Sequence, residues 1–534
     1  MAINPDHAKA LCNLGNVLTA LGQMEEAFAA LNKAVKINAN LGQAQNNLGA
    51  MLGEIGRLDE AVIACRRAVS VPGVQGEFYN NLGQALLRLG LVDEAWQAFS
   101  KAIKLKPQDP SLHSNYLLAM HYQPTMTADD YFREVQIWND RHARKLAPER
   151  DKQGQAGKAS TVGRTPGELN RKLRIGYVSA DFRRHAAAHF LVPILTHHNR
   201  EQFEIHAFAQ VVRPDEVTGQ MRKLTDHWHE LLGLDDTQAA ELIRNQGIDI
   251  LVDLSGHTAY HRLLVFAQKP AQVQVTYLGY PDSTGLATMD YRITDGLADP
   301  PGVTDGYYSE KLLRLPGCAW CYQPIEGDSD LSGRVDCTQR PVVFGCFNNF
   351  AKVNEPLLLL WARILQAVPE SQMFFKGAAI GQPSVVKRLN DFFARQGIDA
   401  NRLRLEGMTQ GQQAHIRKYL EVDIALDTFP YHGTTTTCEA LWMGTPVVSL
   451  IGDRHLNRVG LSLLTAVGLA DLTAQNETQY IEKAVALAQD KTRLQTLHQT
   501  LRQTMKASPS MDGQGFTKRL ENGYQEMWKA ALPR

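Results

Sequence analysis

Residues 422–452, VDIALDTFPYHGTTTTCEALWMGTPVVSLIG, decide the fold of the chain. The apolar run over 422–427 predicts a buried strand that ends in a turn, and residues 434–443 predict a short helix. Gly444 ends this helix, and the apolar run over 446–451 predicts a second strand. A strand, a helix and a strand in this order predict a parallel unit of an α/β sheet.

The same alternation of short apolar strands and helices extends upstream of this segment. The strand-like runs form two series: LRIGYVSADF, FEIHAFA, IDILVDLSG and VQVTYLGYP, then PVVFGCFNNF, SQMFFKG and RLRLEG. Such alternation predicts two doubly wound, Rossmann-like lobes, which we place at residues 173–325 and 341–534. The segment between them, IEGDSDLSGRVDCTQ, is expected to connect the lobes. A ligand is expected in the cleft between the lobes, outside the carboxyl ends of the strands.

The N-terminal part of the chain is repetitive. Asn13, Asn47 and Asn81 each begin an NLG triplet and are spaced by 34 residues, and Gly22, Gly56 and Gly90 follow in the same frame. The period resembles that of the tetratricopeptide repeat, with three repeats and part of a fourth over residues 1–124. Residues 125–172 then predict a bridging helix and a flexible linker. The array is expected to bind polypeptide in a concave groove; the alternative is a stabilising cap.

Composition excludes several classes of partner. The chain has 534 residues, 44% of them hydrophobic and 21% charged, with 56 basic against 56 acidic side chains. No net field therefore draws it to nucleic acid or to an anionic membrane, and no run reaches transmembrane length. The seven cysteines are scattered, which favours a reducing compartment, and the start lacks a signal segment, so we expect a cytoplasmic protein. The isolated Cys318-x-x-Cys321 pair indicates a metal or redox site only weakly.

Several nucleotide and metal motifs are missing from the sequence. No Gly-x-Gly-x-x-Gly follows the first strand of either series, and no Walker lysine loop or His-Glu-x-x-His motif occurs. Nicotinamide chemistry, P-loop hydrolysis and a catalytic metal therefore lose their main support. A phosphate-bearing ligand would have to be held by helix ends, hydroxyl groups and single basic residues.

The four threonines at 434–437 supply such a place. They lie at the expected start of a helix, where free backbone amides and the positive end of the helix dipole favour an anion. Glu439, in the first turns of this helix, can accept hydrogen bonds from a ribose hydroxyl pair. The alternative is helix capping, which needs one threonine and not four. We therefore expect a nucleotide-phosphate site here.

From about Leu173 to its end, the chain resembles the catalytic region of the O-linked N-acetylglucosamine transferase family, to which tetratricopeptide repeats are usually attached. The resemblance is carried by RIGYVSADFRRHAAAHF, YLGYPDSTGLATMDYRITD, FGCFNNFAKVNEPLLLLWARIL, AHIRKYLEVDIALDT and the threonine segment. It implies a GT-B fold and transfer of N-acetylglucosamine from UDP-N-acetylglucosamine to serine or threonine hydroxyls of proteins. It also implies inversion at the anomeric carbon, no required metal and no cofactor. Acceptor proteins are expected in the repeat groove and the interlobe cleft.

The resemblance also assigns roles to particular residues. Lys352 matches the lysine that binds the diphosphate and stabilises the leaving UDP, and Asn349 matches a polar residue beside it. His415 matches the uracil-contacting histidine, and Lys418 lies near the position of a basic partner of that histidine in the family. Thr435 and Thr436 match the pair that holds the phosphates. Glu439 replaces an aspartate expected on the ribose.

Further positions complete the expected site. His185 matches an active-site histidine that has been proposed as a base, and Asp253 and His257 are weaker catalytic candidates at the end of another strand. Thr434 stands where the family often has histidine, and Gln412 stands where it has a lysine. Because both departures lie in the donor pocket, UDP-glucose stays an alternative donor, with asparagine as an alternative acceptor. A non-catalytic repeat scaffold with a degenerate transferase region is the alternative from another class.

Overall fold

The computed structural model describes residues 6–148, 171–324, 331–409 and 411–532, so most of the expected linker at 151–172 lies outside the described residues. The chain divides into two compact units. The first unit comprises residues 1–125, 341–411 and 428–431, and the second comprises residues 126–340, 412–427 and 432–534.

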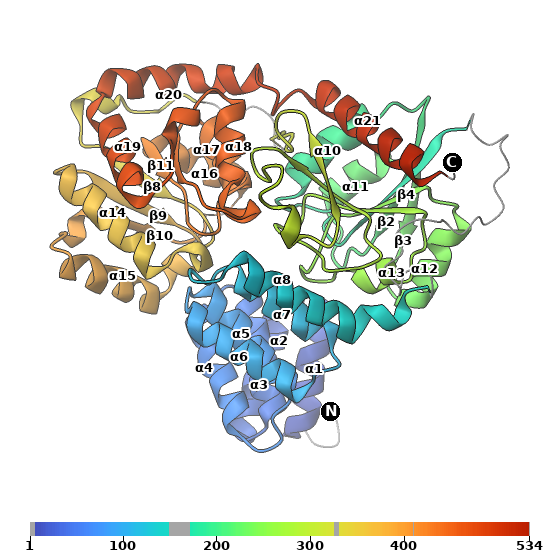
Figure 1. The fold of residues 1–534 in the computed structure, drawn as a ribbon. Coiled ribbons are helices and arrows are strands. Elements are labelled where there is room, and N and C mark those ends of the chain that lie inside the picture. The colour runs from blue at the N-terminus through green and yellow to red at the C-terminus, as the bar shows by residue number, and fades with distance from the viewer. Residues whose placement is uncertain (1–5, 149–170, 325–330, 410, 533–534) are drawn as a thin grey trace. The chain divides into compact units, whose positions relative to one another are not determined.

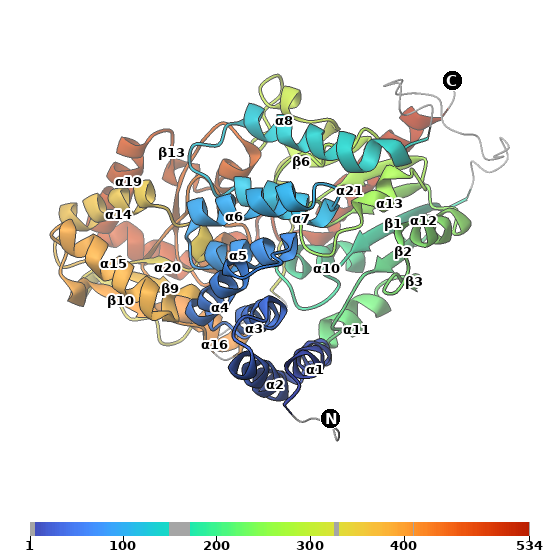
Figure 2. The ribbon, with the colours of Figure 1, turned by 90° about the horizontal axis from the view of Figure 1, so that it is seen from below.

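Helical hairpins form the N-terminal part of the first unit (Figure 2). Their helices are α1 (Ala8–Ala20), α2 (Met24–Ile37), α3 (Gly42–Glu54), α4 (Leu58–Ser70), α5 (Gly76–Arg88), α6 (Val92–Leu105) and α7 (Pro110–Met120). Gly22, Gly56 and Gly90 join the two helices of each hairpin and have φ values of 77°, 80° and 70°. Glycine adopts this left-handed conformation without a Cβ clash, which explains its recurrence at the turn. The predicted repeat array is confirmed.

Small residues set the spacing of the two helices in each hairpin. A Cβ atom at Gly49 of α3 would lie only 2.3 Å from Sγ of Cys65 on α4. The alanines that recur one turn into the second helix are fully buried: Ala27, Ala61 and Ala95. Close helix contact therefore requires these positions to stay small.

The first sheet belongs to the second unit and has the strand order β3-β2-β1-β4-β5-β6-β7. Its strands are β1 (Leu173–Ser179), β2 (Phe203–Ala209), β3 (His227–Glu230), β4 (Ile250–Asp253), β5 (Val273–Thr276), β6 (Tyr291–Asp295) and β7 (Lys311–Leu315). All of the paired neighbours run parallel. The order reverses between β1 and β4, as in a doubly wound fold. The predicted Rossmann-like lobe is confirmed.

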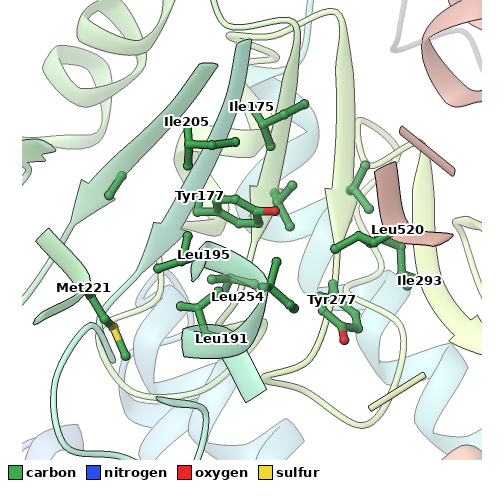
Figure 3. Packing of buried hydrophobic residues seen from close by; sticks show 14 of the residues in the cluster. Ile175, Tyr177, Leu191, Leu195, Ile205, Met221, Leu254, Tyr277, Ile293 and Leu520 are labelled. Atoms are coloured by element: carbon green, nitrogen blue, oxygen red, sulfur yellow. The ribbon is translucent and has the colours of Figure 1, made fainter. Parts of the chain in front are cut away.

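A hydrophobic core fills one side of the first sheet (Figure 3). Ile175 and Tyr177 of β1 and Ile205 of β2 pack there against α10 (Ala188–His197). The C-terminal helix α21 (Gly513–Ala531) adds Phe516, Leu520, Tyr524 and Met527 to the same core (Figure 1). The boundaries expected from the sequence assigned residues 341–534 to the second lobe, but α21 packs its apolar face on the first sheet.

Other helices of the second unit connect its strands or precede them. They are α8 (Ala128–Trp138), α11 (Glu216–Lys223), α12 (Asp236–Asn245) and α13 (Leu263–Ala267). Capping boxes begin α8, α11 and α12, with Thr127, Asp215 and Asp235 as their N-cap residues. Such caps satisfy amide groups that the first turn of a helix leaves open.

The second sheet has the order β10-β9-β8-β11-β12-β13, and its pairs β10–β9, β9–β8, β11–β12 and β12–β13 run parallel, so the second predicted lobe is confirmed. The first unit contains β8 (Val343–Cys346), β9 (Gln372–Lys376) and β10 (Leu403–Glu406), with α14 (Glu355–Ala367) and α15 (Pro383–Arg395). The second unit contains β11 (Ile424–Leu426), β12 (Val447–Leu450) and β13 (Thr473–Ala474), with α16 (Gln412–Arg417), α17 (Thr435–Trp442), α18 (Val459–Ala466), α19 (Glu477–Gln489) and α20 (Lys491–Lys506).

Within the first unit, the repeat turns contact the segment around α15. The Gln382 side chain donates to the backbone oxygen of Gly56 at 3.0 Å and accepts from the Asp59 amide at 3.2 Å. The Arg388 guanidinium donates to the backbone oxygen of Leu89. These bonds fix the repeats on the half of the sheet that carries Lys352.

The structure bears on two features expected from composition: the lack of a membrane span and the state of the cysteines. Among the described residues, no helix combines the length and apolar character needed to cross a lipid bilayer. All seven cysteines are described, and each is buried with a free thiol. Burial raises the pKa of Cys318 and of Cys321 to about 12, which keeps both thiols protonated at neutral pH.

Candidate functional site

The threonine segment forms the start of α17, directly after β11. Thr434 is the N-cap residue, and its side chain makes no capping hydrogen bond among the described residues. Thr437 is buried and donates to the backbone oxygen of Gly433 at 3.0 Å, so it closes the first turn. Thr434, Thr435 and Thr436 are half-buried. The first turn therefore presents amides and hydroxyls that the helix does not use for capping.

Asp427 and His432 hold this segment in place, and no sequence motif predicts a role for either of them. The Asp427 carboxylate accepts from the Gly433 amide and from the Ser449 hydroxyl, both at 2.8 Å. His432 is fully buried, accepts from the Gly460 amide at 3.0 Å through Nδ1, and donates to the Leu450 oxygen at 2.7 Å through Nε2. Both ring nitrogens are thus used for the fold, so His432 does not replace the family histidine expected at 434.

Three of the residues expected around the nucleotide come together on α16 and α17. Gln412 donates through Nε2 to Glu439 Oε1 at 3.1 Å, and His415 Nε2 lies 3.6 Å from Glu439 Oε2. Glu439 is 4% exposed, and His415 and Gln412 are half-buried. Lys418 pairs instead with Glu421 at 3.1 Å. Two of the three departures from the family pattern, Gln412 and Glu439, are therefore direct hydrogen-bond partners.

The Gln412–Glu439 contact leads to a prediction about nucleotide binding. Glu439→Ala removes the acceptor that Gln412 and His415 share, and a hydrogen bond to a charged group contributes about 1.5–3 kcal/mol. We expect the dissociation constant for UDP to rise at least about tenfold, with a smaller change in kcat. Calorimetric titration with UDP checks this value. Lys418→Ala is the comparison, and equal effects in both variants would contradict the assignment.

Lys352 and Asn349 lie in the loop after β8, within the first unit. Asn349 accepts from the Ala351 amide at 3.1 Å and so begins the short 3₁₀ turn Phe350–Lys352. The Lys352 ammonium lies 3.8 Å from the centre of the Tyr431 ring, which is a cation–π contact. The loop thus holds the lysine in one orientation on an aromatic face.

Tyr431 is supported from two sides within the same unit. Asn348 donates to the Thr428 hydroxyl at 2.9 Å, and that hydroxyl donates to the Tyr431 backbone oxygen at 2.6 Å. The Tyr431 ring also packs on Tyr122, just after α7, with ring centres 5.2 Å apart. Tyr431, for which no sequence motif predicts a role, therefore links Lys352 to the end of the repeat array. The only sequence signal that could have indicated a role for Tyr431 is its position just before the threonine run.

His185 lies between β1 and α10 in the second unit. Its Nδ1 is 3.6 Å from the Asp181 carboxylate and accepts from the Ala187 amide at 3.3 Å. The side chain is 41% exposed. Partial burial lowers the pKa of His185 below 6.5, while Asp181 opposes this shift and Arg183 adds to it. The ring is therefore mostly neutral at pH 7 and can accept a proton.

Asp253 and His257 occupy buried positions after β4. Asp253 accepts from the amides of Ser255 and Gly256 and from the Thr276 hydroxyl, at 2.9–3.1 Å. Burial raises the pKa of Asp253 to about 6 despite these donors. His257 Nε2 bonds to the Thr284 oxygen at 2.9 Å, and its ring packs edge-on against Trp138. Within the described residues, both side chains are thus engaged by the fold.

Helical repeats followed by two doubly wound parallel sheets place the protein in the class of repeat-bearing chains with a GT-B-like fold. The pattern of glycosyl transferase family 41 matches residues 157–321 and 334–520, and that of the tetratricopeptide repeat matches residues 8–41 and 52–110. The chain belongs to glycosyl transferase family 41. The suspected resemblance to the O-linked N-acetylglucosamine transferases is confirmed at the level of the family.

Individual relatives agree with this assignment. The chain is similar to a solved structure of an O-GlcNAc transferase mutant from Thermobaculum terrenum, with a TM-score of 0.91, 33% identity and 99% coverage of both chains. It is 38% identical over 431 residues to "Probable UDP-N-acetylglucosamine--peptide N-acetylglucosaminyltransferase SPINDLY" of Solanum lycopersicum and 39% identical over 430 residues to the protein of that name from Arabidopsis thaliana. These matches cover 80% of this chain but only 45% and 46% of the relatives, so the chain spans under half the length of these curated proteins.

Proposed function

We propose that the protein is an inverting, metal-independent glycosyltransferase that moves N-acetylglucosamine from UDP-N-acetylglucosamine to serine or threonine hydroxyls of proteins. The acceptor oxygen forms a bond to the anomeric carbon of the sugar. The bond from that carbon to the β-phosphate oxygen breaks, and UDP leaves with the electron pair. The hydroxyl proton passes to a base or to solvent.

The contact of Gln412 and His415 with the Glu439 carboxylate carries this proposal. It joins a nucleotide-contacting histidine and a ribose acceptor beside the uncapped start of α17. A helix start binds phosphate through its amides and its dipole, so the diphosphate is expected at Thr435 and Thr436. The names of the curated relatives, which specify a UDP-N-acetylglucosamine donor and a peptide acceptor, support the same reaction.

Lys352 supplies the positive charge in this proposal. Negative charge develops on UDP in the transition state, and donors that are oriented before reaction stabilise it without reorganisation. The Tyr431 ring and the turn begun by Asn349 orient the lysine in this way. His185, partly exposed and mostly neutral, is the proposed proton acceptor.

We further propose that acceptor proteins bind through the repeat array and that the reaction takes place in the cytoplasm. Seven free, buried thiols are typical of a reducing compartment. Truncation of the array tests the first part. Loss of protein glycosylation with retained UDP-sugar hydrolysis is the expected result.

A donor screen with the full chain tests the reaction. The protein is incubated with UDP-N-acetylglucosamine or UDP-glucose, with and without a protein extract and in the presence of a chelator. Release of UDP and the mass added to acceptor peptides are then measured. Transfer of N-acetylglucosamine to serine or threonine supports the proposal; turnover only from UDP-glucose, or none from either donor, overturns it.

The lowered pKa of His185 predicts the pH dependence. A base must be neutral to accept a proton, so kcat/KM is expected to fall as the pH decreases through a pKa below 6.5. Rates measured between about pH 5 and pH 8 should show this acid limb. The limb should disappear in His185→Ala. If it persists there with an unchanged midpoint, another group is the base.

A further inference from the structure

Four side chains with metal-binding atoms meet at the edge of the first sheet. Glu204 and His206 lie two residues apart on β2, and His227 and His229 lie two residues apart on β3. The parallel register places His206 opposite His227. Because side chains alternate along a strand, all four lie on one face of the sheet. The proposed transfer reaction uses none of them.

The distances within this cluster match those of a metal coordination shell. Glu204 Oε1 lies 3.0 Å from His227 Nε2 and 3.3 Å from His206 Nε2. Together these ligand atoms are within 4.8 Å of one another. Around a tetrahedral zinc ion with bonds of about 2.0–2.2 Å, neighbouring ligand atoms are about 3.3 Å apart. The three atoms can therefore contact one ion with little movement.

His229 orients the central histidine. His229 Nε2 lies 3.1 Å from His206 Nδ1, and the two rings are stacked with centres 5.4 Å apart. When His206 donates its Nδ1 proton to His229, the lone pair of His206 Nε2 faces the cluster. A ligating histidine typically donates its second ring nitrogen to such a partner, which fixes its tautomer.

The charges around the cluster also suit a cation. His206 is buried and the Glu204 side chain is 26% exposed, so solvent screens their ligand atoms only in part. Arg174 contacts the other carboxylate oxygen, Oε2, at 3.3 Å and leaves Oε1 to the histidines. Two imidazoles and one carboxylate oxygen thus face the same point.

We propose that Glu204, His206 and His227 form a binding site for a divalent transition-metal ion, with zinc as the preferred probe and His229 as a positioning residue. His227 is 48% exposed, so the ion can enter from solvent and keep a water as its fourth ligand. Two imidazoles and a carboxylate favour zinc over magnesium, which prefers oxygen ligands. Bound metal would join the edge strand β3 to β2 and stabilise the first sheet.

The other such cluster among the described residues is a poorer candidate. Cys337, Asp423 and His498 are all buried. Arg340 already binds both oxygens of the Asp423 carboxylate, at 2.7 and 2.8 Å. A fixed guanidinium on the only carboxylate opposes a cation there, whereas Arg174 leaves one oxygen of Glu204 available.

Zinc titration of the full chain tests the proposal. The protein is prepared without a histidine tag, stripped with a chelator and titrated with ZnCl2 by calorimetry, and separately with MgCl2. We expect one zinc per chain, no saturable binding of magnesium and a rise in the melting temperature when zinc is present. Weak binding of many zinc ions, with no single site, would overturn the proposal.

Variants separate this site from other histidines. His227→Ala removes an exposed ligand, so folding should survive while the single zinc site is lost. His229→Phe keeps the stacked ring but removes the partner of His206, and zinc binding should weaken about 10-fold to 100-fold. Glu230→Gln is the matched control, since Glu230 lies on β3 but on the opposite face. Unchanged zinc binding in His227→Ala, or a loss in Glu230→Gln equal to that in His227→Ala, would contradict the assignment.

Discussion

Lys352→Ala is expected to lower kcat by on the order of 10²-fold to 10³-fold, because it removes a donor that stabilises the charge developing on UDP. Water cannot replace this donor well, since the ammonium is held in place on the Tyr431 ring. Initial rates of UDP release at saturating donor and acceptor measure the effect. Lys387→Ala, on the exposed surface of α15, is the matched control and should leave kcat unchanged.

His185→Ala provides the contrast for this result. Its side chain is 41% exposed, so solvent or buffer can accept the proton in its place. Base catalysis contributes about 10²-fold to 10⁴-fold to the rate when the base is well positioned. We expect the loss in His185→Ala to be near the lower of these values, because Asp181 and the Ala187 amide contact the ring only at Nδ1. Lys352→Ala should therefore be the slower enzyme. Equal losses in the two variants would contradict this division of roles.

Local patterns allowed most of the fold to be predicted. The 34-residue spacing predicts helical hairpins because each glycine turn and each buried alanine acts within a single hairpin. The alternation of strands and helices predicts parallel sheets because short connections favour right-handed crossovers. Such local patterns could not predict which sheet α21 packs against. Residues such as Phe516 and Leu520 show that the helix has an apolar face, but not which sheet that face covers.

The sequence could nominate residues for the candidate site, but it could not predict their contacts. Resemblance placed Lys352, His415 and Glu439 near the donor, whereas the hydrogen bond from Gln412 to Glu439 depends on the tertiary position of α16 against α17. Because of this bond, the departures from the family pattern at Gln412 and Glu439 act together rather than separately. Gln412 and Glu439 stand where the family has a lysine and an aspartate, so one positive charge expected in the donor pocket is absent. Donor preference is therefore the property most sensitive to these two positions.

Gly279→Ala is expected to destabilise the second unit by about 3 kcal/mol or more, because the added Cβ has no room. It would lie 1.9 Å from the backbone oxygen of Leu254, so backbone rather than a flexible side chain must move. We expect calorimetry to show a transition lower by about 4 °C or more, because the unfolding entropy grows with the size of the unit. Gly219→Ala in α11 is the control, since its Cβ meets nothing within 4 Å and should stabilise the helix by about 0.5–1 kcal/mol. An unchanged transition in Gly279→Ala would contradict the packing described here.

The same substitution separates stability from catalysis at Asp253 and His257. Gly279 packs on the loop that follows β4, so moving that loop must disturb the amide donors around Asp253. If Asp253 only holds the fold, the folded Gly279→Ala protein should keep most of its kcat at a temperature well below its transition. If Asp253 or His257 takes part in transfer, kcat should fall even where circular dichroism shows a fully folded chain. Measuring kcat and the folded fraction on one sample, with Gly219→Ala beside it, therefore assigns these two residues to structure or to catalysis.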